Sequence, residues 1–230
     1  MVGTAAGISV NFTGGDGPDI LTGNSDADTL NGGSGADTIT GGAGADQMNG
    51  GIGIDRFIQT DQIDSSGSIN ADTINGFNSL VDKIGSWSVG NINSTTGFGD
   101  LVQVNSTNTS VSNGDAIEMS TVAGAFATGG LGANDNLIYI NGNIANTDAL
   151  ETSLENGGGF QMTFDAGIAN TNGFLVLYDD NVNSYLALVQ SGAVAAGGTA
   201  ASGTLTARNL VTFNGVTSNW DSNDFLAFIG

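Results

Sequence analysis

The sequence predicts an all-β protein in two parts: a tandem array of very short strands, then a β-sandwich-like C-terminal domain with one short helix. The first observation is a nine-residue period with an apolar residue at one position of every copy. The second is glycine, 38 of 230 residues, well above the ~7% of ordinary proteins. The third is a series of strand candidates between polar turns. We divide the chain into an N-terminal strand or arm at 1–13, the array with a closing segment at 14–87, and the C-terminal domain at 88–230.

From Gly14 to Ile58 a nine-residue pattern is repeated five times without a gap. Its eighth position suits a short strand that buries one side chain, and it holds Leu21, Leu30, Ile39, Met48 and Phe57. Its sixth position is always aspartate, at Asp19, Asp28, Asp37, Asp46 and Asp55. Five copies in register at these two positions argue against a flexible, low-complexity Gly/Asp tract.

The second and fourth positions hold residue types that tolerate positive φ at low cost. The second position is Gly15, Asn24, Gly33, Gly42 and Gly51, and the fourth is Gly17, Asp26, Gly35, Gly44 and Gly53. We therefore expect the first six residues of each copy to form a turn. We expect positive φ also in the second copy, where Asn24 and Asp26 replace glycine.

This pattern resembles the RTX (repeats-in-toxin), hemolysin-type calcium-binding family, whose repeat is G-G-x-G-x-D-x-U-x with U apolar. The resemblance implies a parallel β-roll in which two repeats form one coil, so that turns two repeats apart stack on one edge. It also implies Ca²⁺ between stacked turns, held by aspartate carboxylates and by backbone carbonyls at positions two and four. The implied pairs, about three sites or more, are Asp19 with Asp37, Asp28 with Asp46, and Asp37 with Asp55. Asp16 and Asp26 add carboxylates near the roll ends.

The chemistry of the array agrees with calcium binding. Ca²⁺ takes roughly six to eight oxygen ligands and needs no nitrogen or sulfur. At the ~4.8 Å spacing of neighbouring strands, two carboxylates repel by about 0.9 kcal/mol even in a water-like dielectric. A divalent cation between them turns this repulsion into attraction.

After the array, residues 59–87 resemble the segment that closes the roll in many RTX proteins, written D-x-I-x-x-F followed by D-x-I. The matching residues are Asp72, Ile74, Phe77, Asp82 and Ile84. Under this resemblance Asp72 and Asp82 are further calcium ligands. The alternative is that both aspartates cap turns while the apolar residues cover the open end of the core.

Beyond residue 88, we expect short strands at 101–104, 136–140 and 204–210, and a hairpin with strands at 174–178 and 185–189. One helix is expected, starting at a capping-box-like pair, Asp148 and Glu151, and ending at the glycines from Gly157 to Gly159. These elements predict a β-sandwich or an extended β-layer. Their order resembles the C-terminal domains of RTX surface-layer-type and adhesin-type proteins.

The composition excludes several classes of function. With 23 acidic and 3 basic residues the formal charge is -20, so no basic surface exists for nucleic acid or anionic lipid. The absence of His and Cys excludes imidazole and thiol nucleophiles and zinc sites. Carboxylate-only catalysis would depend on Glu118, Glu151 and Glu155, two of which lie on the predicted helix, so we expect no enzyme. No apolar run approaches the ~18 residues of a membrane span.

The segment Asp224–Gly230, an acidic residue before an apolar run, resembles the uncleaved signal of type I (ABC transporter) secretion; a final β-strand is the alternative. The N-terminus lacks the cationic start and apolar run of a cleaved secretory signal. We therefore expect an extracellular or cell-surface protein with the transporter as a partner. One expected function is a calcium-folded structural protein that assembles with itself into a surface layer, filament or matrix. The alternative is the calcium-binding secretion module of a larger RTX toxin, hydrolase or adhesin.

Overall fold

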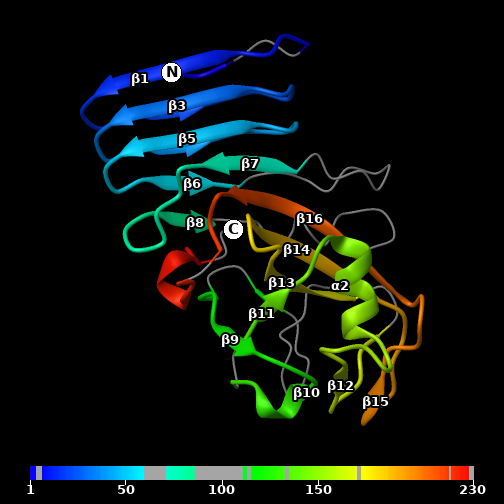
Figure 1. Ribbon diagram of the computed structural model, residues 1–230. Helices are drawn as coiled ribbons and strands as arrows, with labels where there is room; N and C mark the ends of the chain where they lie inside the picture. Colours follow the sequence, from blue (N-terminus) through cyan, green and yellow to red (C-terminus); the bar gives the residue numbers. More distant parts are fainter. Residues whose placement is uncertain are drawn as a thin grey trace.

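The computed structural model describes residues 1–3, 7–59, 71–85, 111–112, 115–132, 135–169, 172–217 and 219–227. Strands are the predominant regular structure of these residues, and one α-helix is present among them (Figure 1). The all-β class is therefore confirmed. The strand predicted at 101–104 lies outside the described residues. In the described part of the chain, no helix has the length and apolar character needed to cross a membrane.

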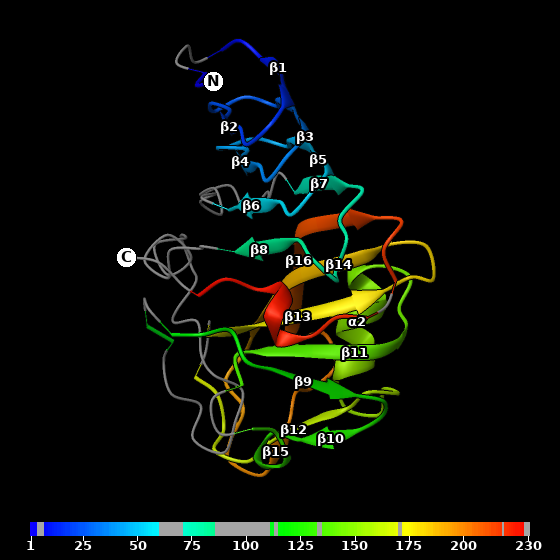
Figure 2. The same ribbon diagram turned by 90° about the vertical axis from the view of Figure 1, so that its left-hand side faces the viewer.

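The nonapeptides form a parallel roll with two facing sheets (Figure 2). One wall consists of β1 (Asn11–Asp16), β3 (Thr29–Ser34), β5 (Gln47–Ile52) and β7 (Asp72–Asn75). The other consists of β2 (Ile20–Thr22), β4 (Thr38–Thr40), β6 (Arg56–Ile58) and β8 (Lys83–Gly85). Leu30 pairs with Met48, and Leu21 pairs with Ile39, so each strand lies beside the strand two repeats away. Two repeats per coil, as the resemblance implied, is the observed register.

The core of the roll consists of the eighth-position side chains, all of which are at most 1% exposed: Leu21, Leu30, Ile39, Met48 and Phe57. Ile74 and Ile84 of the closing segment extend the same stack and are fully buried. Alternate strands contribute these side chains from opposite walls, so each coil adds two apolar residues to one continuous core. The prediction of one inward residue per repeat is confirmed.

A further coil without the repeat sequence precedes the first copy. Val2 bridges Thr22 at the edge of β2, and Phe12 of β1 pairs with Leu30. The N–H of Gly3 donates to the carbonyl oxygen of Thr22 at 2.8 Å. The predicted N-terminal strand or arm therefore continues the roll by one turn.

The wall that begins with β1 does not end at the roll. β7 pairs in parallel with β16 (Leu205–Asn214), placing Ile74 beside Phe213. The sheet then continues through β14 (Ser184–Ser191), β13 (Gly173–Asp179), β11 (Leu137–Asn143) and β9 (Met119–Val122), giving nine strands. The division at residue 88 stays a prediction, but the sheet itself runs across it without a break.

The C-terminal half of this sheet is covered on its outer face. Helix α2 (Thr147–Leu154) and a three-stranded sheet of β10 (Phe126–Ala127), β12 (Met162–Phe164) and β15 (Gly198–Thr199) pack there. Short 3₁₀ segments occur at η1 (Thr128–Gly130) and η2 (Ser222–Asp224). A separate β-sandwich is thus not confirmed, because the large strands extend the wall of the roll.

The predicted helix exists, but its start was wrong. The N-cap is Asn146, whose Oδ1 accepts from the N–H of Ala149 at 2.9 Å. Asp148 lies inside the first turn of the helix. The side chain of Glu151 does not form a capping box, because its Oε1 accepts from the N–H of Ala207 on β16 at 2.5 Å. Leu150 and Leu154 bury the inner face against the sheet.

The predicted hairpin at 174–189 is confirmed by β13 and β14, and the strands expected at 136–140 and 204–210 correspond to β11 and β16. A buried polar network fixes the hairpin. Asp179 accepts from the hydroxyls of Tyr139, at 2.5 Å, and Ser184, whose oxygen accepts from the indole N–H of Trp220 at 2.9 Å. Trp220 also stacks on Phe77 of the closing segment, with ring centroids 5.3 Å apart. The aromatic contact joins the roll to the C-terminal half.

The chain's last described residues complete the other wall. Phe225 bridges Ile84 of β8, and the N–H of Leu226 donates to the carbonyl oxygen of Ile84 at 2.8 Å. Residues 228–230 lie outside the described residues. The secretion signal therefore stays a prediction.

Candidate calcium sites

One ladder of aspartates runs along the edge where β1, β3, β5 and β7 turn into β2, β4, β6 and β8. Oδ1 of Asp37 accepts from the N–H of Asp19 at 2.8 Å, and Oδ1 of Asp55 accepts from the N–H of Asp37 at 3.0 Å. Asp82 continues the series by accepting from the N–H of Asp55 at 2.9 Å. We call these four residues the first ladder.

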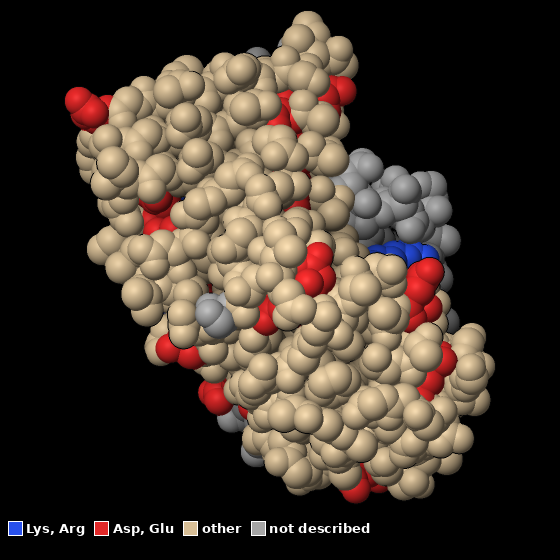
Figure 3. Space-filling model, in the orientation of Figure 1, with Lys and Arg blue, Asp and Glu red and all other residues tan. Residues whose placement is uncertain are grey.

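A second ladder lies at the opposite edge of the roll. Oδ1 of Asp46 accepts from the N–H of Asp28 at 2.7 Å, and Oδ1 of Asp72 accepts from the N–H of Asp46 at 2.9 Å. At its outer end, Asp28 accepts from the N–H of Val10 at 2.7 Å. Val10 thus occupies the place of a sixth-position aspartate in the N-terminal coil, which has no carboxylate there. On the face shown in Figure 3, acidic side chains lie at the margins of the roll rather than across the middle of its strands.

The closing segment therefore brings Asp72 and Asp82 into the ladders although neither belongs to a nonapeptide. Their spacings from Asp46 and Asp55 exceed two repeats, yet β7 pairs in register with β5 and β8 pairs in register with β6. The capping alternative also has support, because Oδ2 of Asp82 accepts from the N–H of Asn78 at 2.8 Å. Asp82 thus accepts from Asp55 through Oδ1 and from the closing turn through Oδ2, and its role as a calcium ligand stays a prediction.

The second carboxylate oxygens test whether a cation fits. Oδ2 of Asp37, Asp46 and Asp55 is buried and has no hydrogen-bond donor. An unpaired buried carboxylate oxygen costs free energy that a bound cation can offset. Within the described residues no three acidic side chains converge on one point, so backbone carbonyls must complete a Ca²⁺ shell. The donor set, carboxylate and carbonyl oxygen without nitrogen or sulfur, fits Ca²⁺.

Position one of the repeat is a functional position that the sequence reasoning missed. It is Gly14, Gly23, Gly32, Gly41 and Gly50. A Cβ on any of them would overlap Oδ2 of the aspartate five residues later, so these glycines make room for that oxygen, which is the unpaired one in Asp37, Asp46 and Asp55. The signal was available, because the position is glycine in all five copies.

The glycines at positions two and four have positive φ, as predicted: Gly15, Gly17, Gly33, Gly35, Gly42, Gly44, Gly51 and Gly53. A Cβ on Gly33 would overlap the carbonyl oxygen of Gly15, and one on Gly51 would overlap that of Gly33. Carbonyl oxygens of one turn therefore lie directly against the next turn, where a cation between turns could use them. Whether each residue is a ligand stays a prediction.

The expectation of positive φ at Asn24 and Asp26 is wrong. Among described non-glycine residues only Asn181 and Asn219 have positive φ. A Cβ makes that conformation costly, and side-chain hydrogen bonds shape this turn instead. Oδ1 of Asn24 accepts from the N–H of Asp26 at 2.8 Å, and Oδ2 of Asp26 accepts from Gly7 and Ile8 at 2.6 and 3.0 Å. Asp26 thus holds the N-terminal coil, while Asp16 is exposed at the end of β1.

Burial makes the ladder carboxylates reluctant to ionise. Burial, together with repulsion from the preceding carboxylate in the ladder and against a lowering by the backbone hydrogen bond, raises the pKa of Asp46 to about 6 and that of Asp72 to about 7. Burial also raises the pKa values of Asp55 and Asp82. Without a cation, the folded roll therefore binds protons that the unfolded chain releases.

The chain was then compared with known proteins. Residues 11–39 and 22–57 match the family model described as RTX calcium-binding nonapeptide repeat (4 copies). These residues are RTX repeats. RTX nonapeptides bind Ca²⁺ as a structural, non-catalytic module typical of secreted proteins, and four copies fit three or more ions. No curated protein matches the chain.

The RTX match starts at Asn11, so it includes β1 of the coil that lacks an aspartate. Outside the repeats, two of the three glutamates considered for catalysis, Glu151 and Glu155, have structural side-chain contacts. Glu155 accepts from the N–H groups of Gly203, Thr204 and Leu205 at 2.9–3.1 Å. Together with the bond of Glu151, these hydrogen bonds fix the helix region to the start of β16.

The raised pKa values predict that protons compete with calcium. A raised carboxyl pKa stabilises the calcium-free roll below pH ~4, and this stabilisation is lost as pH rises through about 6 to 7. Calcium requires the ionised carboxylates, so binding releases protons. We expect the stability gained from calcium, measured as the difference in free energy of unfolding between calcium and chelator, to be smaller at pH 5.5 than at pH 7.5 by at least about 1 kcal/mol. Denaturant unfolding followed by circular dichroism at both pH values measures it; an equal gain at the two values would contradict the role of these carboxyls.

Proposed function

We propose that this protein is an extracellular structural protein whose RTX roll folds on calcium and which then assembles with itself. The observation that carries the proposal is the set of buried, unpaired oxygens on Asp37, Asp46 and Asp55. At the low free calcium concentration inside a cell, neighbouring carboxylates within each ladder repel one another, which destabilises the folded roll. At millimolar calcium outside, sites with Kd of about 10⁻⁴–10⁻³ M fill, and each adds RT ln(1 + [L]/Kd) to stability.

A calcium-dependent fold suits export through a type I transporter, because the chain crosses the membrane before calcium folds it. The C-terminal segment resembling such a signal supports the transporter as a partner. A non-enzymatic role is supported by Glu151 and Glu155, whose carboxylates are occupied by backbone donors.

Self-assembly is supported by the N-terminal end of the roll. β1 is the last strand of the nine-stranded sheet and exposes most of its residues. An edge strand offers backbone groups to a strand from another copy. Apolar side chains at the same end are 57–68% exposed, namely Met1, Val2, Ile8 and Ile20.

A calcium titration of chelator-treated protein, followed by circular dichroism and light scattering, tests both parts. We expect β-structure and large particles to appear together near millimolar calcium. Magnesium is the matched control, because it has the same charge but prefers a rigid octahedral shell, and it should be far less effective. β-structure without particle growth would favour the alternative, a calcium-folded module of a larger protein. No response to calcium would contradict the proposal.

A further inference from the structure

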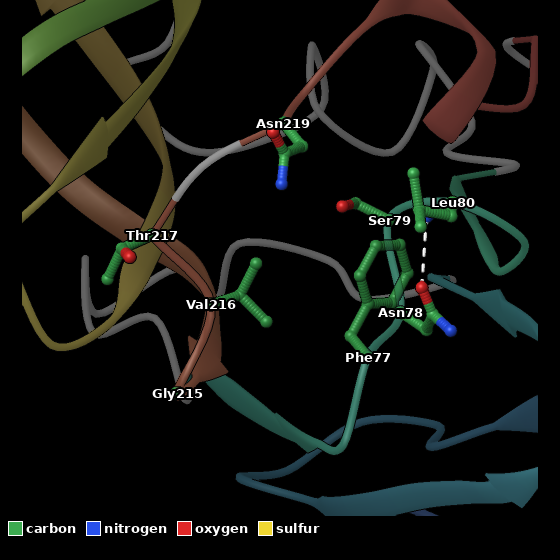
Figure 4. A pocket seen from close by; sticks show the side chains of 8 residues that line it. All are labelled: Phe77, Asn78, Ser79, Leu80, Gly215, Val216, Thr217 and Asn219. Carbon is green, nitrogen blue, oxygen red and sulfur yellow. Dashed lines mark hydrogen bonds between the residues drawn. The ribbon is translucent and has the colours of Figure 1, made fainter.

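A pocket of about 290 Å³ lies where the roll meets the C-terminal half. One wall is Phe77–Leu80 of the closing turn, and the other is Gly215–Thr217 with Asn219, after β16 (Figure 4). This volume is at the lower end for small-molecule sites, enough for one or two sugar-sized rings. The pocket is not part of either carboxylate ladder.

The lining of the pocket is uncharged, although the chain carries 23 acidic residues. Phe77, Leu80 and Val216 supply apolar surface, and Leu80 is 79% exposed at the rim. The polar side chains belong to Asn78, Ser79, Thr217 and Asn219. An ionic ligand would find no counter-charge here, and a purely aliphatic one would leave the amides and hydroxyls unpaired.

The polar groups are available to a ligand. Figure 4 shows the Asn219 amide and the Ser79 hydroxyl directed toward the space beside Phe77 and Val216. No side-chain hydrogen bond of Asn219 or Ser79 occurs among the described residues. Oδ1 of Asn78 accepts from the N–H of Leu80 at 3.1 Å, which leaves its NH₂ group free.

Both walls are held in place before any ligand arrives. Asn78 donates its N–H to Oδ2 of Asp82 at 2.8 Å, and its carbonyl oxygen accepts from the N–H of Asp82 at 2.8 Å. On the other side, the carbonyl oxygen of Val216 lies 2.6 Å from the hydroxyl oxygen of Ser184, and the N–H of Gly215 donates to Oδ1 of Asn183 at 3.0 Å. Since Asp82 ends the first ladder, the closing turn has its pocket shape only when the roll is folded.

Asn219 is held at a φ of 67°, next to Trp220, which turns into the core. Glycine adopts this conformation at lower cost, so Asn219→Gly removes the amide without straining the backbone. The chain also contains a matched control. Asn181, in the β13–β14 turn, has a φ of 70° and does not line the pocket.

We infer that this pocket binds a neutral saccharide, with the apolar residues against the ring carbons and the amides and hydroxyl against the sugar hydroxyls. Amphipathic, uncharged ligands match an amphipathic, uncharged site. Because the closing turn depends on the roll, binding requires calcium although the sugar does not touch it.

The test uses full-length, ¹⁵N-labelled protein in saturating calcium, with folding checked first by circular dichroism. Cellotriose, maltotriose and mannotriose are titrated and the backbone amide signals of Leu80 and Val216, which line the pocket, are followed by NMR in the unmodified protein and in each variant; trigalacturonate is the anionic control. We expect a shift with at least one neutral trisaccharide and none with trigalacturonate. Asn219→Gly and Ser79→Ala should each weaken binding about fivefold, from loss of one hydrogen bond, and Asn181→Gly should leave it unchanged.

Absence of binding by the folded protein would overturn the inference while leaving calcium-dependent folding intact. Equal binding of trigalacturonate would overturn the uncharged-ligand assignment. Equal weakening by Asn181→Gly, or none by Asn219→Gly and Ser79→Ala, would place the binding elsewhere.

Discussion

Replacing Asp37 with Asn should remove about 3 kcal/mol of calcium-dependent stability at 10 mM calcium. Asp37 lies in the interior of the first ladder, so its carboxylate belongs to the intervals toward both Asp19 and Asp55. A site with a Kd of ~1 mM contributes about 1.4 kcal/mol at that concentration, and two such intervals lose a charge. Asn keeps the size and can still accept from the N–H of Asp19. The measurement is the difference in free energy of unfolding between calcium and chelator.

Asp19→Asn is the matched control, because Asp19 ends the ladder and belongs to one interval, toward Asp37. Its loss should be about half as large, ~1.4 kcal/mol. Asp46 and Asp55 are also interior and should behave like Asp37. Equal effects at Asp19 and Asp37 would contradict the assignment of cations to the intervals between stacked turns.

Gly32→Ala should abolish most of the calcium response and cost at least about 3 kcal/mol. The new Cβ would overlap Oδ2 of Asp37 and the carbonyl oxygen of Gly50, so either the carboxylate or the adjacent turn must move. Gly32 does not have positive φ, so the expected loss of stability comes from the steric overlap with Oδ2 of Asp37, the oxygen left free for calcium, and not from backbone strain. Denaturant unfolding with and without calcium measures both losses.

Gly124→Ala provides the control for Gly32→Ala. Gly124 also lacks positive φ, and a Cβ there would meet no atom within 4 Å. Its substitution should change stability by no more than about 0.5 kcal/mol and leave the calcium midpoint unchanged. If Gly32→Ala were equally mild, the close packing of position one against the aspartate would be incorrect.

The roll was predictable because its information is local and repeated. A single apolar position recurs at a fixed period and predicts the core, whereas the register of two repeats per coil and the aspartate pairs were implied by the RTX resemblance. The closing aspartates, Asp72 and Asp82, break the period. They could be named only through resemblance; the hydrogen bonds place both in the ladders, while their role as calcium ligands stays a prediction.

The features that were missed depend on contacts between distant residues. The pairing of Ile74 with Phe213 joins the roll to the C-terminal strands, and no sequence pattern near either residue predicts this pairing. The helix start was misplaced because Asn146 and Asp148 are both good cap residues, and Glu151 found a tertiary partner on β16. At Asn24 and Asp26, side-chain hydrogen bonds outweighed the backbone preference that composition indicated.

The continuity of the nine-stranded sheet has a consequence for chelated protein. With the roll unfolded, β16 loses β7 as its neighbour, and the hydrogen-bonding groups from Val211 to Asn214 are left along a bare margin. The C-terminal half then has an exposed sheet edge that can pair with strands of other molecules. Under the proposed function, calcium keeps this edge covered by β7, so storage in chelator should promote aggregation rather than leave a dispersed monomer.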